Sequence, residues 1–145
     1  MSVFARNEET GSFEFLSADV VLTPADTDVF LKMLNNELGM AQLKVKRARE
    51  AELTAERTYL EARSVLLLDE DAPEVGRKVG QVSQKEQDAW FADRIPDPYW
   101  ALREARIARA NAVDYAWQVK AQVELMRSLN VNAKAMYDSY RGGGR

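Results

Sequence analysis

The chain contains neither cysteine nor histidine among its 145 residues. Without cysteine it has no disulfides, thiolate nucleophiles or cysteine-ligated metals, and this composition suits a reducing compartment. Without histidine it lacks the commonest general base and the commonest transition-metal ligand, which excludes every zinc-finger pattern. Neither a carboxylate pair suited to acid-base chemistry nor a glycine-rich phosphate loop stands out. The sequence therefore predicts a protein that is not an enzyme and that carries no cofactor or metal.

Long apolar runs are also lacking. No run approaches the roughly 20 residues that a membrane-spanning helix needs. The N-terminal residues 1–10 are polar and acidic, unlike a signal peptide. These absences predict a cytoplasmic protein with no membrane partner.

What the chain does have is an apolar repeat of seven residues in two long stretches. The spacings alternate three and four, which places the apolar residues of each stretch on one stripe of a helix, interrupted by Glu52, Arg109 and Asn130. The two stripes comprise Leu31, Leu34, Leu38, Ala41, Val45, Ala48, Glu52, Ala55, Tyr59, Ala62 and Leu66, and Leu102, Ala105, Arg109, Ala112, Ala116, Val119, Val123, Met126, Asn130, Ala133, Tyr137 and Tyr140. Two long helices that pair through these stripes are expected.

Capping signals set the ends of the helices. Thr23 followed by Pro24 predicts the start of a first helix over residues 24–67, and the acidic stretch 69–71 before Pro73 ends it. A solvated turn is the simpler interpretation of that acidic stretch, with a divalent-ion site as the alternative. Ser83 and Glu86 match a capping box for a short helix that ends by residue 95, and a last helix is expected from residues 97–98 to 140.

These elements predict an all-α fold, a long antiparallel helical hairpin of the coiled-coil kind with a short third helix near the turn. The hairpin domain spans residues 23–140. Residues 1–22 form an N-terminal arm in which Phe13, Phe15 and residues 20–22 make either a short strand or a cover over the helices. Residues 141–145 form a flexible tail.

The interruptions of the stripes suggest a register for the hairpin. If Glu52 faces Arg109, paired residue numbers add to 161, which sets Leu31 opposite Asn130. Solvent or subunit contacts are the alternative explanation for these polar residues.

Alanine dominates both stripes and buries little area per residue, so the hairpin alone gains limited stability. Other large apolar residues lie off the stripes, and their faces are expected to meet other copies in a homo-oligomer, an isolated monomer being the alternative. The off-stripe residues are Phe30, Met33, Met40, Leu53, Leu60, Trp100, Ile107, Trp117, Leu125 and Leu129. Leu53, Leu60, Trp100, Trp117 and Leu125 are the candidate interface residues.

Charge is distributed unevenly along the chain, with a net −5 over residues 1–40 and +4 over residues 99–145. The densest basic cluster falls on the first helix, where Tyr59 offers a surface on which a base can stack. Basic residues arranged along a helix are suited to contacts with the phosphates of a single nucleic-acid strand. However, six positive and four negative residues interleave over residues 44–63, and such a mixture is also typical of an ordinary solvated helix surface. The candidate nucleic-acid-binding residues are Lys44, Lys46, Arg47, Arg49, Arg57, Tyr59 and Arg63.

The order of these features resembles a known family. A long charged first helix precedes a loop with a short Ser-x-x-Glu helix, and the long last helix carries an apolar-x-Ser-x run at residues 126–130. This organisation, over residues 27–141, resembles the bacteriophage recombination mediators of the UvsY type. The resemblance implies a ring-like homo-oligomer that binds single-stranded DNA and helps to load a recombinase where single-strand-binding protein is present, in the host cytoplasm if a phage encodes the chain. By position it implies DNA contacts at Arg57 and Arg63, with Lys44, Lys46, Arg47 and Arg49 nearby.

Two functions therefore compete. The first is a non-enzymatic, oligomeric single-stranded-DNA-binding recombination mediator. The alternative is a helical structural or assembly protein, such as a virion or scaffolding component, that binds only protein. The net charge of −3 and the acidic arm depart from the first family.

Overall fold

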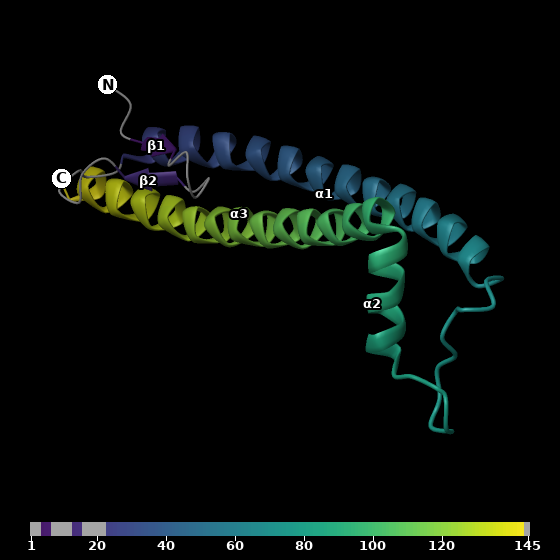
Figure 1. Ribbon diagram of the computed structural model, residues 1–145. Coiled ribbons are helices and arrows are strands. Elements are labelled where there is room, and N and C mark those ends of the chain that lie inside the picture. The colour runs from purple at the N-terminus through teal and green to yellow at the C-terminus, as the bar shows by residue number, and fades with distance from the viewer. Residues whose placement is uncertain (1–3, 7–12, 16–22, 144–145) are drawn as a thin grey trace. The chain divides into compact units, whose positions relative to one another are not determined.

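The computed structural model describes residues 4–6, 13–15 and 23–143. Its elements are strands β1 (Phe4–Arg6) and β2 (Phe13–Phe15) and helices α1 (Pro24–Leu66), α2 (Gln84–Arg94) and α3 (Pro96–Gly142) (Figure 1). The two long helices pair with each other, and the short α2 lies between them in the sequence. The prediction of an all-α helical hairpin with a short third helix is confirmed.

The chain divides into two compact units, which are described separately. Unit 1 comprises residues 1–45 and 112–145, and unit 2 comprises residues 46–111. Both long helices contribute one part to each unit.

Two of the three helix starts follow the predicted capping chemistry. At α1 the Asp26 amide donates to Thr23 Oγ1 at 3.2 Å, and the Thr23 amide donates back to Asp26 Oδ2 at 3.2 Å. At α2 the capping box forms in full, because the Glu86 amide donates to Ser83 Oγ at 3.2 Å and the Ser83 amide donates to Glu86 Oε2 at 2.7 Å. The start of α3 differs from the prediction.

Helix α3 begins at Pro96, before the predicted pair at residues 97–98, and it continues to Gly142, beyond the predicted end at residue 140. A proline has no amide hydrogen, so it fits the first turn of a helix, where amides lack intrahelical partners. Pro98 also falls in this first turn, which explains why the helix accommodates both prolines. Residues 144–145 of the predicted tail lie outside the described residues.

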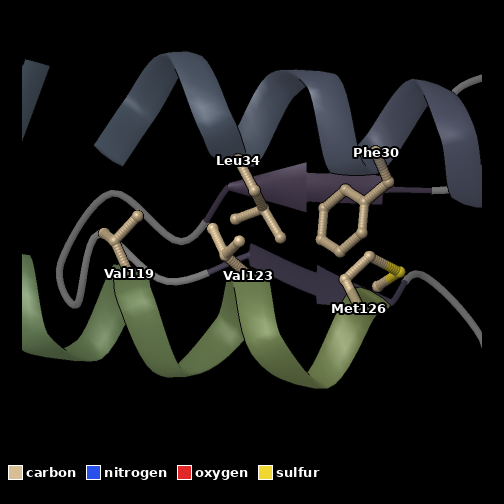
Figure 2. Close-up of a cluster of buried hydrophobic side chains, with 5 residues drawn as sticks. All are labelled: Phe30, Leu34, Val119, Val123 and Met126. Atoms are coloured by element: carbon tan, nitrogen blue, oxygen red, sulfur yellow. The ribbon is translucent and has the colours of Figure 1, made fainter. Parts of the chain in front are cut away.

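The core of unit 1 forms where α1 and α3 face each other. Phe30 and Leu34 from α1 point toward Val119, Val123 and Met126 from α3, and all five are buried (Figure 2). Four of these residues belong to the predicted stripes. Phe30 was predicted to lie on an outer face, and this prediction is wrong, because a wide apolar helix face buries residues beside the central seam.

Polar side chains close one end of this core. Thr27 is fully buried, and its hydroxyl donates to Asn130 Oδ1 at 2.7 Å. The Asn130 side-chain amide donates to Asp28 Oδ1 at 3.1 Å, and Lys134 lies 3.4 Å from the same oxygen. Leu31 packs against the apolar core instead of facing Asn130, so the predicted register is wrong at this position. The observed partner of Asn130 lies one helical turn earlier.

Strands β1 and β2 form an antiparallel pair in which Phe4 faces Phe15 and Arg6 faces Phe13. The strand alternative for Phe13 and Phe15 is therefore the observed one. Residues 20–22, which were predicted to belong to the same extended segment, lie outside the described residues.

In unit 2 the stripes supply Tyr59 and Leu102, both buried, and α2 supplies Phe91, which is fully buried. The ring of Tyr59 meets the ring of Tyr99 edge to face, with centroids 6.1 Å apart. After α1, the backbone amide of Asp71 donates to Asp69 Oδ1 at 3.0 Å, so the acidic stretch forms a hydrogen-bonded turn.

Every residue of the first stripe is at least partly buried, and so is the second stripe as far as Ala133. Tyr137 and Tyr140 end the second stripe, and both are exposed, contrary to the prediction. They lie beyond the position that pairs with the start of α1, so no stripe residue of that helix faces them.

Candidate nucleic-acid interface

Four basic residues of α1 lie on the surface of unit 2. Lys46, Arg47, Arg49 and Arg57 are all exposed. Lys46 and Arg57 are three helical turns apart, so they share the face opposite the buried stripe, at a separation of about 16 Å along the helix axis. Arg47 and Arg49 flank that face.

Acidic residues interleave with these cations in the sequence, and two of them share their face. Glu50 and Glu61 are exposed and lie one helical turn after Lys46 and Arg57, whereas a third acid points away. Glu52 lies on the buried side of α1 and forms an ion pair with Arg109 Nε, while Arg106 Nε lies 3.8 Å from its other oxygen. The predicted contact between Glu52 and Arg109 is confirmed.

Within the part of the chain that the structure describes, Lys46, Arg47, Arg49 and Arg57 form no ion pair within 4 Å. The four cations are therefore free to contact an anionic partner, while the exposed Glu50 and Glu61 lower the net positive charge of the surface.

Tyr59 is only 9 % exposed and packs in the interior of unit 2. Burial raises the pKa of its hydroxyl above the ordinary value of 10.0, although the nearby Arg63 opposes this shift. A base cannot stack on a ring that is covered in this way, so the prediction of Tyr59 as a stacking surface is wrong.

Arg63 is half-buried and holds α2 against α1. Its guanidinium carbon lies 5.0 Å from the centre of the Phe91 ring, and Nη2 donates to Gln87 Oε1 at 3.5 Å. Gln87 in turn donates to the carbonyl of Pro73 at 2.9 Å, which ties the loop to the same cluster. Arg63 Nε is buried and has no hydrogen-bond partner in the described structure.

Lys44 belongs to unit 1, where its ammonium group lies 5.8 Å from the centre of the Tyr115 ring. The Tyr115 hydroxyl donates to Glu37 Oε1. Lys44 is exposed and therefore remains a candidate for phosphate contact in that unit.

Unit 2 also contains a cavity of about 560 Å³ that the sequence did not predict. Arg63 from α1 lines it together with Arg103 and Arg106 from α3, and the carboxylates of Glu56 and Asp88 complete its charged lining. The net positive charge of residues 99–145 indicated that α3 carries cations such as Arg103 and Arg106. Nothing in the sequence indicated that these two residues share a cavity with Arg63.

The candidate interface residues for self-association are all exposed. Leu53, Leu60 and Trp100 lie on unit 2, and Trp117 and Leu125 lie on unit 1. Leu53 and Leu60 are seven residues apart and border a shallow hollow along the outer side of α1. Exposed apolar side chains at this spacing are suited to contact with another helix.

Within the described ranges, no group of three or more carboxylates is arranged to hold a metal ion. None of the described helices is long and apolar enough to cross a membrane. Comparison of the chain with known protein families, curated proteins and solved structures finds no significant match.

Proposed function

We propose that this chain is a non-enzymatic, oligomeric protein that binds single-stranded DNA and acts as a recombination mediator. The observation that supports this proposal best is the group of exposed cations on α1 that form no ion pair among the described residues, namely Lys46, Arg47, Arg49 and Arg57. Cations held along a rigid helix can contact successive phosphates of a strand, and each contact releases counterions from the nucleic acid. The commitment of Glu52 to α3 weakens the competing interpretation of a balanced, solvated surface.

The mediator role rests on the resemblance in organisation to the UvsY type. A protein that loads a recombinase binds the strand without cleaving or modifying it, so this role needs no catalytic group. Recombinase and single-strand-binding protein are the partners that this role implies. The exposed apolar residues on both units support self-association, which would place several basic helices on one strand and raise the overall affinity.

A salt titration tests the DNA-binding proposal. Fluorescence anisotropy with a labelled oligonucleotide should give an affinity that falls steeply with ionic strength. The double variant Lys46→Ala, Arg57→Ala should bind more weakly and reduce the slope of log K against log salt by about 1.4, since each phosphate contact to a single strand contributes roughly 0.7. The matched control is Lys32→Ala, Arg127→Ala, which removes two exposed cations of unit 1 and should leave the slope unchanged.

Absence of binding at low salt would reject DNA binding and favour the alternative, a structural or assembly protein that binds only protein. The exposed apolar residues are the observation that favours this alternative. Oligomer mass measured with and without the oligonucleotide separates the two functions, because only the first predicts a complex that contains DNA.

A further inference from the structure

The cavity of unit 2 combines opposite charges in an unusual way. It is lined by three guanidinium groups and two carboxylates and has a volume of about 560 Å³, within the ~300–1,000 Å³ range of small-ligand sites. No ion pair within 4 Å joins any of these five groups to another among the residues that the structure describes. Among the described residues, Arg106 alone of the five groups forms an ion pair, with Glu52, which lies outside the lining.

The three guanidinium groups of the cavity differ in how firmly neighbouring residues hold them. Arg63 donates through Nη2 to Gln87 Oε1 at 3.5 Å and lies over the Phe91 ring, so its charge is held at the cavity by neutral partners. Arg106 makes only a long contact of 3.8 Å to Glu52. Arg103 and Arg106 are exposed, so their guanidinium groups are the donors that an anionic ligand in the cavity can reach.

An aromatic wall completes the cavity. Tyr99 lines it, and Arg103 lies over the Tyr99 ring at 5.9 Å while its Nη1 donates to the Tyr99 hydroxyl at 3.2 Å. A guanidinium plane or an aromatic ring offers a flat surface on which a base can stack. The cavity thus holds a stacking surface, anion-binding donors and carboxylate acceptors within one unit.

We infer that this cavity receives one nucleotide of the bound strand and prefers bases that carry an exocyclic amino group. Arg106 holds the phosphate, the base stacks on the guanidinium of Arg103, which Tyr99 supports from below, and Glu56 and Asp88 accept hydrogen bonds from the amino group. Adenine, cytosine and guanine carry such a donor, whereas thymine carries carbonyl oxygens at its exocyclic positions and offers a carboxylate only its ring N3–H. This inference rests on the proposed binding of single-stranded DNA and names the part of the strand that the cavity recognises.

The affinities of the chain for two homopolymers test the preference for bases with an exocyclic amino group. Labelled oligo(dC) and oligo(dT) of about 30 nucleotides, long enough to cover several binding sites, are compared by anisotropy at one salt concentration. The native chain should bind oligo(dC) at least about fivefold more tightly than oligo(dT). Glu56→Gln, Asp88→Asn preserves the shape of both side chains and should abolish or reverse this ratio, because an amide can donate to thymine carbonyls.

The matched control replaces two exposed acids of α1 that do not line the cavity, Glu50→Gln and Glu61→Gln, and should leave the ratio unchanged. Arg103→Ala should weaken the binding of both homopolymers, with helical content checked by circular dichroism. Equal affinities for the two homopolymers, or a ratio that the cavity variants do not alter, would overturn the inference while DNA binding stands. If neither homopolymer binds at low salt, the proposed function fails and the inference fails with it.

Discussion

The hydrogen bond between Thr27 and Asn130 is buried at the end of an apolar core. Asn130→Ala removes the acceptor and leaves the Thr27 hydroxyl with only the Pro24 carbonyl at 3.0 Å. Loss of a buried hydrogen bond typically costs about 1–3 kcal/mol, so the free energy of unfolding in urea should fall by that amount. Asn132→Ala, at an exposed position of the same helix, is the control and should cost far less. Equal losses in the two variants would contradict a specific role for the hydrogen bond.

The ion pair between Glu52 and Arg109 interrupts both stripes at a half-buried site. Glu52→Ala should lower the free energy of unfolding by about 1 kcal/mol, because it leaves a guanidinium without its counter-charge in a partly desolvated environment. The double substitution Glu52→Leu, Arg109→Leu should restore or exceed the original stability, since apolar side chains pack in a seam without a desolvation cost. Urea denaturation checks both, and a double variant less stable than Glu52→Ala would reject this account.

Tyr59 makes stability depend on alkaline pH. Because burial raises the pKa of its hydroxyl in the folded state, the unfolded chain ionises first as pH rises through 10. The contribution of Tyr59 is therefore fully present below pH 10 and is lost as pH increases toward the raised pKa. Tyr59→Phe should flatten this alkaline loss, whereas Tyr140→Phe, at an exposed position, should not. Thermal unfolding at several pH values between about 9 and 11 measures the difference.

Among the elements, α2 depends most on its capping residues, because a helix of 11 residues is marginal on its own. Ser83→Ala removes the side-chain acceptor of the capping box and should speed hydrogen exchange of the α2 amides about fivefold, which corresponds to a capping energy of about 1 kcal/mol. Ser128→Ala, in the middle of α3, is the control and should not alter exchange in α2.

The same capping box should respond to acid. Hydrogen bonds from the backbone and side chain of Ser83 lower the pKa of Glu86 below its ordinary value of 4.5. The stabilisation is present above pH 4.5 and disappears as pH falls through the lowered pKa.

The elements were largely predictable because their signals are local. A threonine or serine cap, a proline in the first turn and a seven-residue apolar repeat act within a few residues of each other. The start of α3 was misjudged because Pro96 and Pro98 both fit a first turn, so local preference did not distinguish them.

Register was less predictable than the elements themselves. Glutamate and arginine have long side chains that reach across a helical turn, so the contact of Glu52 with Arg109 tolerates more than one alignment, as its second contact with Arg106 shows. The short side chains of Thr27 and Asn130 meet only when their backbones are close, and they fix the alignment one turn away from the predicted one. Short polar pairs are therefore better guides to register than long ion pairs.

At the scale of the whole molecule, self-association is the main expectation. Trp117 is 66 % exposed and Leu125 is 59 % exposed, both on α3 in unit 1. Trp117→Ser, Leu125→Ser should raise the concentration of half-assembly by about tenfold or more, because large apolar side chains dominate interface energies. Sedimentation velocity over a dilution series measures this change, with circular dichroism to show that the helices persist.

The control for self-association is Gln118→Ser, Arg127→Ser, which changes two exposed polar residues of the same helix. The contradicting result is that the native chain and the double variant at Trp117 and Leu125 give the same oligomer mass at every dilution. That result would show that these two residues do not form the interface.

The candidate DNA surface was only partly predictable. The cations of α1 lie within 20 residues of one another in the sequence, so their clustering was visible. The burial of Tyr59 depends on Tyr99, which lies 40 residues later. The cavity was not predictable for the same reason, since Arg103 and Arg106 come next to Arg63 only through tertiary packing.

The contact between Thr27 and Asn130 also bears on the order in which the chain folds. These residues lie 103 positions apart, whereas Arg63 and Gln87 lie 24 apart. Closing a long loop costs more entropy than closing a short one, so we expect the nucleus to form around Arg63, Gln87 and Phe91 and pairing to spread from there. Each pair that forms shortens the loop left for the next one. On this pathway the Thr27 hydroxyl keeps its water until late in folding.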